Sequence, residues 1–482
     1  MQPPAYDWWI AHAHEDSAFL LLTEYPDVFE QAVTSRLVQL GRPADQGVLN
    51  QAKWRAIWEQ DRYGSLSSIL QAIQPRAETP YRPLNGPLRL DHRALRDDTG
   101  PFPLVGVSAF WAPWAVRHNQ GQLDRFAEWA VGAGMTYVRW FGSHDWAGGT
   151  DVQTANYFAL MERTIELLAD HGLRSEITCF TRRHIVSDPA YFVREWASLA
   201  KQHPDKVACV EIANEWNHSD NGWEDEEIRA LGNVFRERCD TPLALSAAAA
   251  PDWESLEDRL SDLYSDGAAT ITTVHFPRRD NTSEGPWRWV RQPWHAKHGV
   301  TDCPSPVIDN EHQRWDKSYQ GRCVEVAAAA PLTAFVCGCA LSAHHDVYGV
   351  FNDCGEYNHG DSGAQLQRVL STVLPFVPSD IANWQSTRVG NGGGPHPFPG
   401  LLDQHWTFEP NPSHGVSRSF AAVHGDQFAM TLTGVRDYVA LDDVQPRPYR
   451  VLSLATGDEV YNGSGPVRLD STDGTAFFAV TT

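Results

Sequence analysis

The chain lacks the features that would direct it to nucleic acid or to a membrane. Only 39 of its 482 residues are Lys or Arg, against 61 Asp and Glu, which gives a formal net charge of −22 at pH 7. An acidic surface repels nucleic acid and anionic lipid at long range. The longest apolar stretches, such as 333–343, fall well short of the roughly 20 residues of a membrane-spanning helix. We therefore expect no nucleic-acid partner and no membrane span.

Two further patterns are missing. The first residues, Met1-Gln-Pro-Pro-Ala-Tyr-Asp7, do not form the basic segment followed by an apolar one that marks a secretory signal. This predicts a cytoplasmic protein, or one released without a classical signal peptide, association with a virion included. The eight Cys show neither a Cys-x-x-Cys pair nor zinc-ribbon spacing, which favours reduced and mostly buried thiols.

Tryptophan, by contrast, is abundant. The chain has 19 Trp within a globular composition that is 42% hydrophobic and 21% charged. The flat indole ring stacks on the C–H faces of sugars, although core packing explains many Trp residues. We expect a sugar contact only where a Trp follows the end of a predicted strand.

The length and the change of pattern along the chain predict several domains. Apolar residues recur at near-helical spacing within 26–40, and the Pro-rich stretch 75–87 follows as a connector. We therefore predict an N-terminal helical module at 1–90. Beyond residue 375 the helical period stops and hairpin patterns begin, with Gly425-Asp426 as one turn. This predicts a β-sandwich-like domain at 379–482.

Between these segments, short apolar runs alternate with longer amphipathic segments, which is typical of repeated βα units around a parallel sheet. The eight predicted strands are Pro103–Ser108, Thr136–Phe141, Arg174–Phe180, Val207–Ala213, Leu243–Ala247, Thr270–His275, Val307–Asn310 and Thr333–Ala340. The predicted helices between them include 123–133, 157–171, 191–203 and 226–238. Eight such units at 91–378 predict a (βα)8 TIM barrel, whose active sites lie at the C-terminal strand ends.

Two acids stand at the ends of predicted strands. Glu215 follows strand four and Glu311 follows strand seven. Both should rise from the same rim of the barrel. Cleavage of a glycosidic bond needs one carboxylic acid that protonates the leaving oxygen and a second carboxylate that attacks or activates water. Glu215 must therefore start protonated, which a neighbouring carboxylate favours, whereas an arginine such as Arg139 favours an ionised Glu311.

The run Ile212-Ala-Asn-Glu-Trp-Asn217 resembles the strand-four Asn-Glu motif of the clan A glycoside hydrolases, which are retaining (βα)8 barrels. The resemblance covers about residues 100–375. It implies that Glu215 is the acid/base, that Glu311 is the nucleophile and that Asn214 binds the 2-hydroxyl of the sugar. The run Tyr137-Val-Arg-Trp-Phe141 is similar to the strand-two segment of the clan, which implies that Arg139 lies beneath the nucleophile.

The same resemblance places His275 at the strand-six position where the clan often has a His. Two departures accompany it. Phe276 and Pro277 follow His275, where many members have a Tyr that contacts the nucleophile. Strand eight ends without the Trp that floors the sugar site in many members, so His344 and His345 are expected to line the pocket. Trp111, Trp146 and Trp216 follow strand ends and are candidate sugar platforms.

The sequence therefore predicts a retaining hydrolase of O-glycosidic bonds, commonly β-linked, with a carbohydrate substrate and no cofactor or metal. Two alternatives stay open. A non-catalytic carbohydrate-binding or virion-type structural protein could use the same scaffold, although the presence of both Glu residues argues against it. A metal-dependent barrel hydrolase usually needs His-x-His after the first strand, where Val107-Ser-Ala-Phe-Trp111 stands instead.

Overall fold

The computed structural model describes twelve parts of the chain, all within the compact unit Pro80–Thr482. They are residues 84–145, 149–247, 260–275, 287–290, 293–294, 303–312, 323–345, 360–389, 403–406, 419–441, 447–470 and 475–482. Most of the helical module predicted at 1–90 lies outside these residues, so that module stays a prediction.

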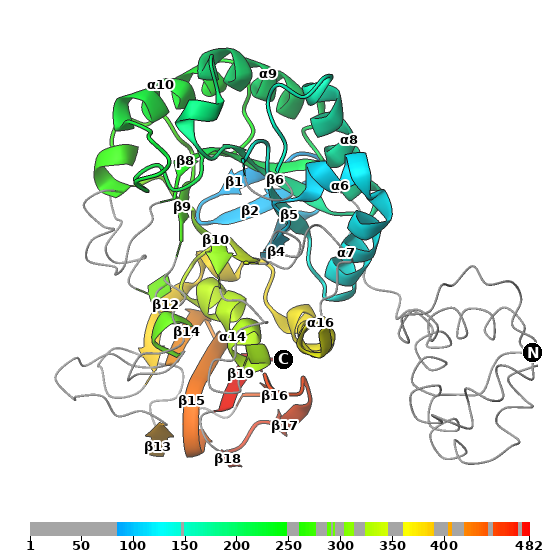
Figure 1. Cartoon of the computed structure of the whole chain (residues 1–482). Helices are drawn as coiled ribbons and strands as arrows, with labels where there is room; N and C mark the ends of the chain where they lie inside the picture. Colours follow the sequence, from blue (N-terminus) through cyan, green and yellow to red (C-terminus); the bar gives the residue numbers. More distant parts are fainter. Residues whose placement is uncertain are drawn as a thin grey trace, which may run out of the picture. The chain divides into compact units, whose positions relative to one another are not determined.

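Eight parallel strands form the barrel (Figure 1). They are β4 (Leu104–Ser108), β5 (Tyr137–Phe141), β6 (Arg174–Phe180), β7 (Val207–Ala213), β8 (Leu243–Ser246), β9 (Thr272–Val274), β10 (Val307–His312) and β11 (Leu341–His344). Their order is β8-β7-β6-β5-β4-β11-β10-β9. The backbone N–H groups of Thr270 and Ile271 donate to the carbonyl of Leu243 and join β9 to β8. The predicted (βα)8 barrel is confirmed.

Helices cover the outside of this ring. They are α6 (Ala112–His118), α7 (Gln120–Gly132), α8 (Tyr157–Asp170), α9 (Pro189–Gln202), α10 (Asp225–Arg236), α12 (Trp287–Val290), α14 (Cys323–Val336) and α16 (Gly360–Val373). The start of α9 shows why a helix begins where it does. Pro189 fits the first turn, and Asp188 accepts a hydrogen bond from the N–H of Tyr191. Within the described residues, no helix is long and apolar enough to cross a membrane.

A three-stranded antiparallel sheet precedes the barrel: β1 (Arg89–Asp91), β2 (Ala94–Asp97) and β3 (Gly100–Phe102). Leu95 and Phe102 of this sheet share a buried cluster with Tyr137 and with Ala208, which stand near the starts of β5 and β7. The sheet therefore closes the N-terminal end of the barrel, opposite the end where Glu215 and Glu311 lie. The sequence patterns did not predict it, because its strands are only three or four residues long.

The prediction of strand eight at Thr333–Ala340 is wrong. Residues 323–336 form α14, and the strand is β11, Leu341–His344. The helix is buried along nearly its whole length, so its sequence has no polar face and reads as an apolar run. Such a run does not distinguish a buried helix from a buried strand.

The C-terminal part is an antiparallel, sandwich-like assembly of strands, as predicted. Its strands are β12 (Gln385–Val389), β13 (Asp403–Trp406), β14 (Ser419–His424), β15 (Gln427–Leu441), β16 (Tyr449–Ser453), β17 (Glu459–Gly463), β18 (Val467–Asp470) and β19 (Thr475–Thr481). The long strand β15 pairs with β14 and β19 along its first half and with β13 and β18 along its second.

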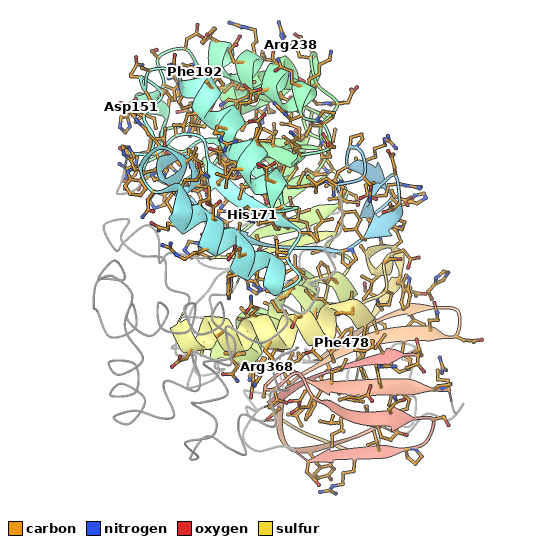
Figure 2. The ribbon with its side chains drawn as sticks, turned by 90° about the vertical axis from the view of Figure 1, so that its right-hand side faces the viewer. Asp151, His171, Phe192, Arg238, Arg368 and Phe478 are labelled. Atoms are coloured by element: carbon orange, nitrogen blue, oxygen red, sulfur yellow. The ribbon has the colours of Figure 1, made fainter. Side chains whose placement is uncertain are left out.

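Two hydrogen bonds, one of them buried, join this part to the helices of the barrel. Thr333 of α14 donates a hydrogen bond to Thr431 of β15, and Gln365 of α16 donates to the carbonyl of Ala455. Figure 2 shows the helix that carries Arg368 lying between the barrel and the strands that include Phe478. The barrel and the C-terminal strands thus share one buried boundary.

Candidate active site

Arg139 on β5 is the centre of a buried polar cluster at the C-terminal end of the barrel. Its guanidinium donates to Glu311 Oε2 of β10 at 2.8 Å. It also donates to Glu211 Oε2 and to Asn214 Oδ1, both at 2.9 Å. The side chain is fully buried, and its guanidinium lies 5.0 Å from the ring of Phe141. Arg139 therefore fixes three side chains from two other strands at one point.

Glu311 receives contacts from three directions. Besides Arg139, His275 Nε2 lies 3.5 Å from Oε2, and His345 Nδ1 lies 3.4 Å from Oε1. The residue is buried, with 6% of its surface exposed. A nearby guanidinium favours the ionised form of a carboxylate. The arrangement suits a carboxylate that stays charged in a nearly dry site.

His275, directly after β9, connects the two predicted catalytic acids. Its Nδ1 lies 3.1 Å from Glu215 Oε1, while its Nε2 faces Glu311. The ring is 5% exposed. Both carboxyl groups thus lie within reach of one imidazole. Glu215 is 60 positions before His275 in the chain, and Glu311 is 36 positions after it. A two-carboxylate mechanism needs two carboxyl groups near each other on one rim.

Glu215 itself is partly exposed and stands directly after β7 and Asn214. Its backbone is left-handed, with φ of +42°, a conformation that residues other than Gly rarely adopt. The carbonyls of Asn214 and Glu215 both accept hydrogen bonds from the side-chain amide of Asn221, and the N–H of Trp216 donates to Ser246 Oγ at 3.1 Å. The backbone around Glu215 is therefore anchored on both sides.

Two acids that the sequence patterns did not single out lie below the rim. Asn310 donates to Glu176 Oε1 of β6 at 2.8 Å and to Glu211 Oε1 of β7 at 3.3 Å. Burial raises the pKa of Glu176 to about 8, against the lowering effect of Arg139. Burial opposes ionisation of Glu211 as well, but Arg139 and hydrogen bonds bring its pKa below the usual value.

A signal for these two acids was present in the sequence. Each is a charged residue within a strand whose other residues are buried, and charges inside buried strands are normally paired. At neutral pH the cluster holds Glu176 as a neutral acid and Glu211 as a carboxylate. Burial lowers the pKa of Arg139, but Glu211 and Glu311 raise it well above the usual value, so Arg139 stays charged.

The other predicted sugar-binding residues differ in exposure. His345 reaches Glu311, whereas His344 is buried in β11 at 1% exposure. Trp111 is fully buried with its ring edge against Phe126, and Trp216 is 4% exposed with its indole N–H donated to Asp225. These two indoles pack in the core, which leaves their predicted role as sugar platforms without support. Trp146 lies outside the described residues.

No group of three or more His, Cys, Asp and Glu side chains in the described ranges is arranged to hold a metal ion. The rim instead presents two carboxyl groups, one imidazole between them and an amide from Asn214.

Solved structures share this fold. A protein from Bacteroides vulgatus ATCC 8482, described provisionally as a glycoside hydrolase, superposes with a TM-score of 0.55 at 11% identity, over 82% of each chain. A glycoside hydrolase family 30 subfamily 8 xylanase from Clostridium acetobutylicum gives 0.46 at 10% identity, over 83% of this chain and 100% of its own. The exo-β-1,4-mannosidase Op5Man5 from Opitutaceae bacterium strain TAV5 gives 0.42 at 14%, over 53% and 54%.

The first likeness shows a shared fold, and the two weaker ones add nothing to it. No protein-family model matches the chain, and no curated protein matches it.

Proposed function

We propose that the protein is a retaining glycoside hydrolase that cleaves O-glycosidic bonds of an uncharged, β-linked carbohydrate. The observation that carries the proposal is the single His275 ring that faces both Glu215 and Glu311, with Arg139 held against Glu311. The net charge of −22 disfavours strongly anionic polymers as substrates. One protein of similar fold, described provisionally as a glycoside hydrolase, is consistent with the same class.

In the first step, Glu311 attacks the anomeric carbon while Glu215 gives its proton to the leaving oxygen. The bond between that carbon and the leaving oxygen breaks, and a glycosyl ester with Glu311 forms. Arg139 keeps Glu311 ionised before the attack, and the amide of Asn214 is placed for the 2-hydroxyl. In the second step, Glu215 takes a proton from water, whose oxygen displaces Glu311 from the sugar.

One tautomer of His275 suits the state that begins this cycle. With its proton on Nε2, the ring donates towards Glu311 and offers the lone pair of Nδ1 to the protonated Glu215. This tautomer fits a pair in which Glu215 carries the proton and Glu311 the charge. This is the distribution that attack and leaving-group protonation need.

The test is turnover of a panel of aryl β-glycosides by the wild-type chain and by the variants Glu311→Ala and Glu215→Ala. We expect no detectable turnover with Glu311→Ala. With Glu215→Ala we expect a loss of roughly 10²- to 10⁴-fold for substrates that need protonation of the leaving group. Product NMR on the wild type should show the anomer that retains the configuration.

Azide separates the two roles. It should react with the glycosyl ester in Glu215→Ala and give a glycosyl azide of retained configuration, whereas Glu311→Ala should give the inverted azide. Melting temperatures close to wild type serve as the folding control. A wild-type chain that binds oligosaccharides without cleaving them would instead identify a carbohydrate-binding protein, and undiminished turnover in either variant would rule out these roles.

A further inference from the structure

The left-handed backbone of Glu215 needs an explanation in its surroundings. A Glu residue at φ of +42° is strained, and such a conformation persists only where neighbouring groups hold it. It occurs at the one residue that the proposed mechanism requires to move a proton twice. Two side chains, those of Asn221 and Ser246, bind the backbone next to it.

Asn221 holds the peptide groups on the N-terminal and C-terminal sides together. Its Nδ2 donates to the carbonyl of Asn214 at 3.0 Å and to that of Glu215 at 2.9 Å. Asn221 is 7% exposed, and its own carbonyl accepts a hydrogen bond of 2.7 Å from the N–H of Arg183. The amide is thus fixed by the neighbouring loop before it binds the two carbonyls.

Ser246, at the end of β8, holds the next peptide group. Its Oγ accepts the N–H of Trp216 at 3.1 Å, and the side chain is fully buried. The hydroxyl of Tyr264 in turn accepts the N–H of Ser246 and donates to its carbonyl. The position of Ser246 is therefore set by the strand and by Tyr264, and not by Glu215.

We propose that Asn221 and Ser246 are positioning residues that hold Glu215 in its left-handed conformation and so direct its carboxyl group at the leaving oxygen. This inference rests on the proposed function and explains what holds the backbone of its proton donor, Glu215. Without the clamp, residue 215 relaxes to negative φ, which turns its Cα–Cβ bond away from His275. Glu311 keeps its place, because Arg139, His275 and His345 contact it from outside β7.

Loss of the clamp should slow only the reactions in which Glu215 must protonate the leaving group. A misplaced acid slows the departure of an alkoxide or weakly acidic phenol, which needs the proton. A 2,4-dinitrophenolate leaves without protonation and does not depend on it. The variants Asn221→Ala and Ser246→Ala should therefore lose on the order of 10²-fold in kcat/KM with an alkyl or phenyl β-glycoside. With the 2,4-dinitrophenyl glycoside of the same sugar, kcat/KM should stay within about threefold, since it reports only the first step.

Two matched controls separate this effect from general loosening of the fold. Asn383 also binds two backbone groups with its side chain, the N–H groups of Arg93 and Ala94, but at the closed end of the barrel. Ser175 is a fully buried serine near the start of β6. Asn383→Ala and Ser175→Ala should change kcat/KM by the same factor with both substrates, whatever they do to the melting temperature. If Asn221→Ala does not fold, Ser246→Ala against Ser175→Ala decides the question.

An equal loss with both leaving groups, or no loss with either, would overturn the positioning role. Azide should also raise kcat of Asn221→Ala with the dinitrophenyl substrate, because the second step then no longer needs the base. If the wild type cleaves no glycoside at all, the proposed function fails before the positioning role is examined. The two failures are therefore distinguishable.

Discussion

Three carboxyl groups, one of them that of the proposed nucleophile Glu311, lie around one guanidinium. Arg139 contacts Glu211 and Glu311 directly, and Glu176 lies 3.8 Å from its Nε. A single positive charge cannot stabilise three buried negative charges, so one acid stays protonated. The pKa of Glu176, raised by burial to about 8, identifies that acid. Its hydrogen bond from Asn310 keeps it in place without a charge.

The variant Glu176→Gln tests this assignment through stability. The folded protein keeps the Glu176 proton up to pH of about 8, whereas the unfolded chain releases it above about 4.5. Ionisation in the unfolded state therefore lowers the wild-type stability as the pH rises between these values. Gln is uncharged in both states and has the same shape. We expect the variant to gain up to about 4 kcal/mol relative to wild type on going from pH 4.5 to pH 8.

Thermal melts of both proteins at the two pH values measure this gain. The Gln side chain can still accept from Asn310, so its effect at pH 4.5 should be small. A difference between variant and wild type that does not change with pH would mean that Glu176 is ionised in the folded protein.

For single residues, the sequence predicted those at the C-terminal rim of the barrel better than those inside the barrel below the rim. Glu215, Glu311 and Asn214 stand at strand ends, where position along the chain gives position in the barrel. Their hydrogen-bond partners are set by closure of the sheet. Closure brings Arg139 to Glu311, although the two are 172 residues apart in the chain. Glu176, Glu211 and Asn221 were missed, because no local pattern states which residues meet inside the closed ring.

Among the elements, the first seven strands of the barrel were predicted closely, whereas helix α14, which precedes its last strand, was not. The first seven predicted strands overlap β4 to β10, since each is a short apolar run between polar segments. For α14, burial against β15 on one side and the barrel on the other removed the periodic pattern that identifies a helix. The small sheet β1 to β3 was missed because short strands give little signal.

The junction between β8 and β9 depends on one tyrosine. The hydroxyl of Tyr264 accepts the N–H groups of Leu245, Ser246 and Thr273 and donates to the carbonyl of Ser246. It thus supplies bonds where direct pairing of the two strands is limited to residues near Leu243. Burial of this hydroxyl raises the pKa of Tyr264 beyond its usual value, so it stays a neutral donor.

We expect Tyr264→Phe to keep the fold but to weaken this junction. The buried N–H groups lose their acceptor, at a cost of about 1–3 kcal/mol. Hydrogen exchange should become faster at the amides of Leu245, Ser246 and Thr273 and stay unchanged at β5 and β6. Uniform acceleration over the whole barrel would instead indicate that the tyrosine stabilises the fold globally.

For the molecule as a whole, the barrel and the C-terminal strands share a core. Trp294, in the segment between β9 and β10, stacks on Phe420 of β14 with ring centroids 5.1 Å apart. Both rings are buried. Trp294 therefore packs against the C-terminal strands.

The variant Phe420→Ala should lower the stability of both parts together, by about 3–5 kcal/mol. Catalytic activity and far-UV circular dichroism should then be lost at the same, lowered temperature. Val460→Ala, at a side chain that is 45% exposed, is the control and should change stability by less than about 0.5 kcal/mol. Loss of the strand signal before the activity would show that the two parts unfold separately.

The left-handed backbone at residue 215 also bears on how this chain can change. Gly and Asn accommodate that backbone with less strain than Glu, and neither can pass a proton to a leaving oxygen. At this position heat resistance and turnover therefore favour different residues. Under the proposed mechanism, a lineage or a laboratory library selected for thermal survival alone would drift away from Glu215 while keeping the barrel intact, and it would accumulate well-folded proteins without the proposed activity.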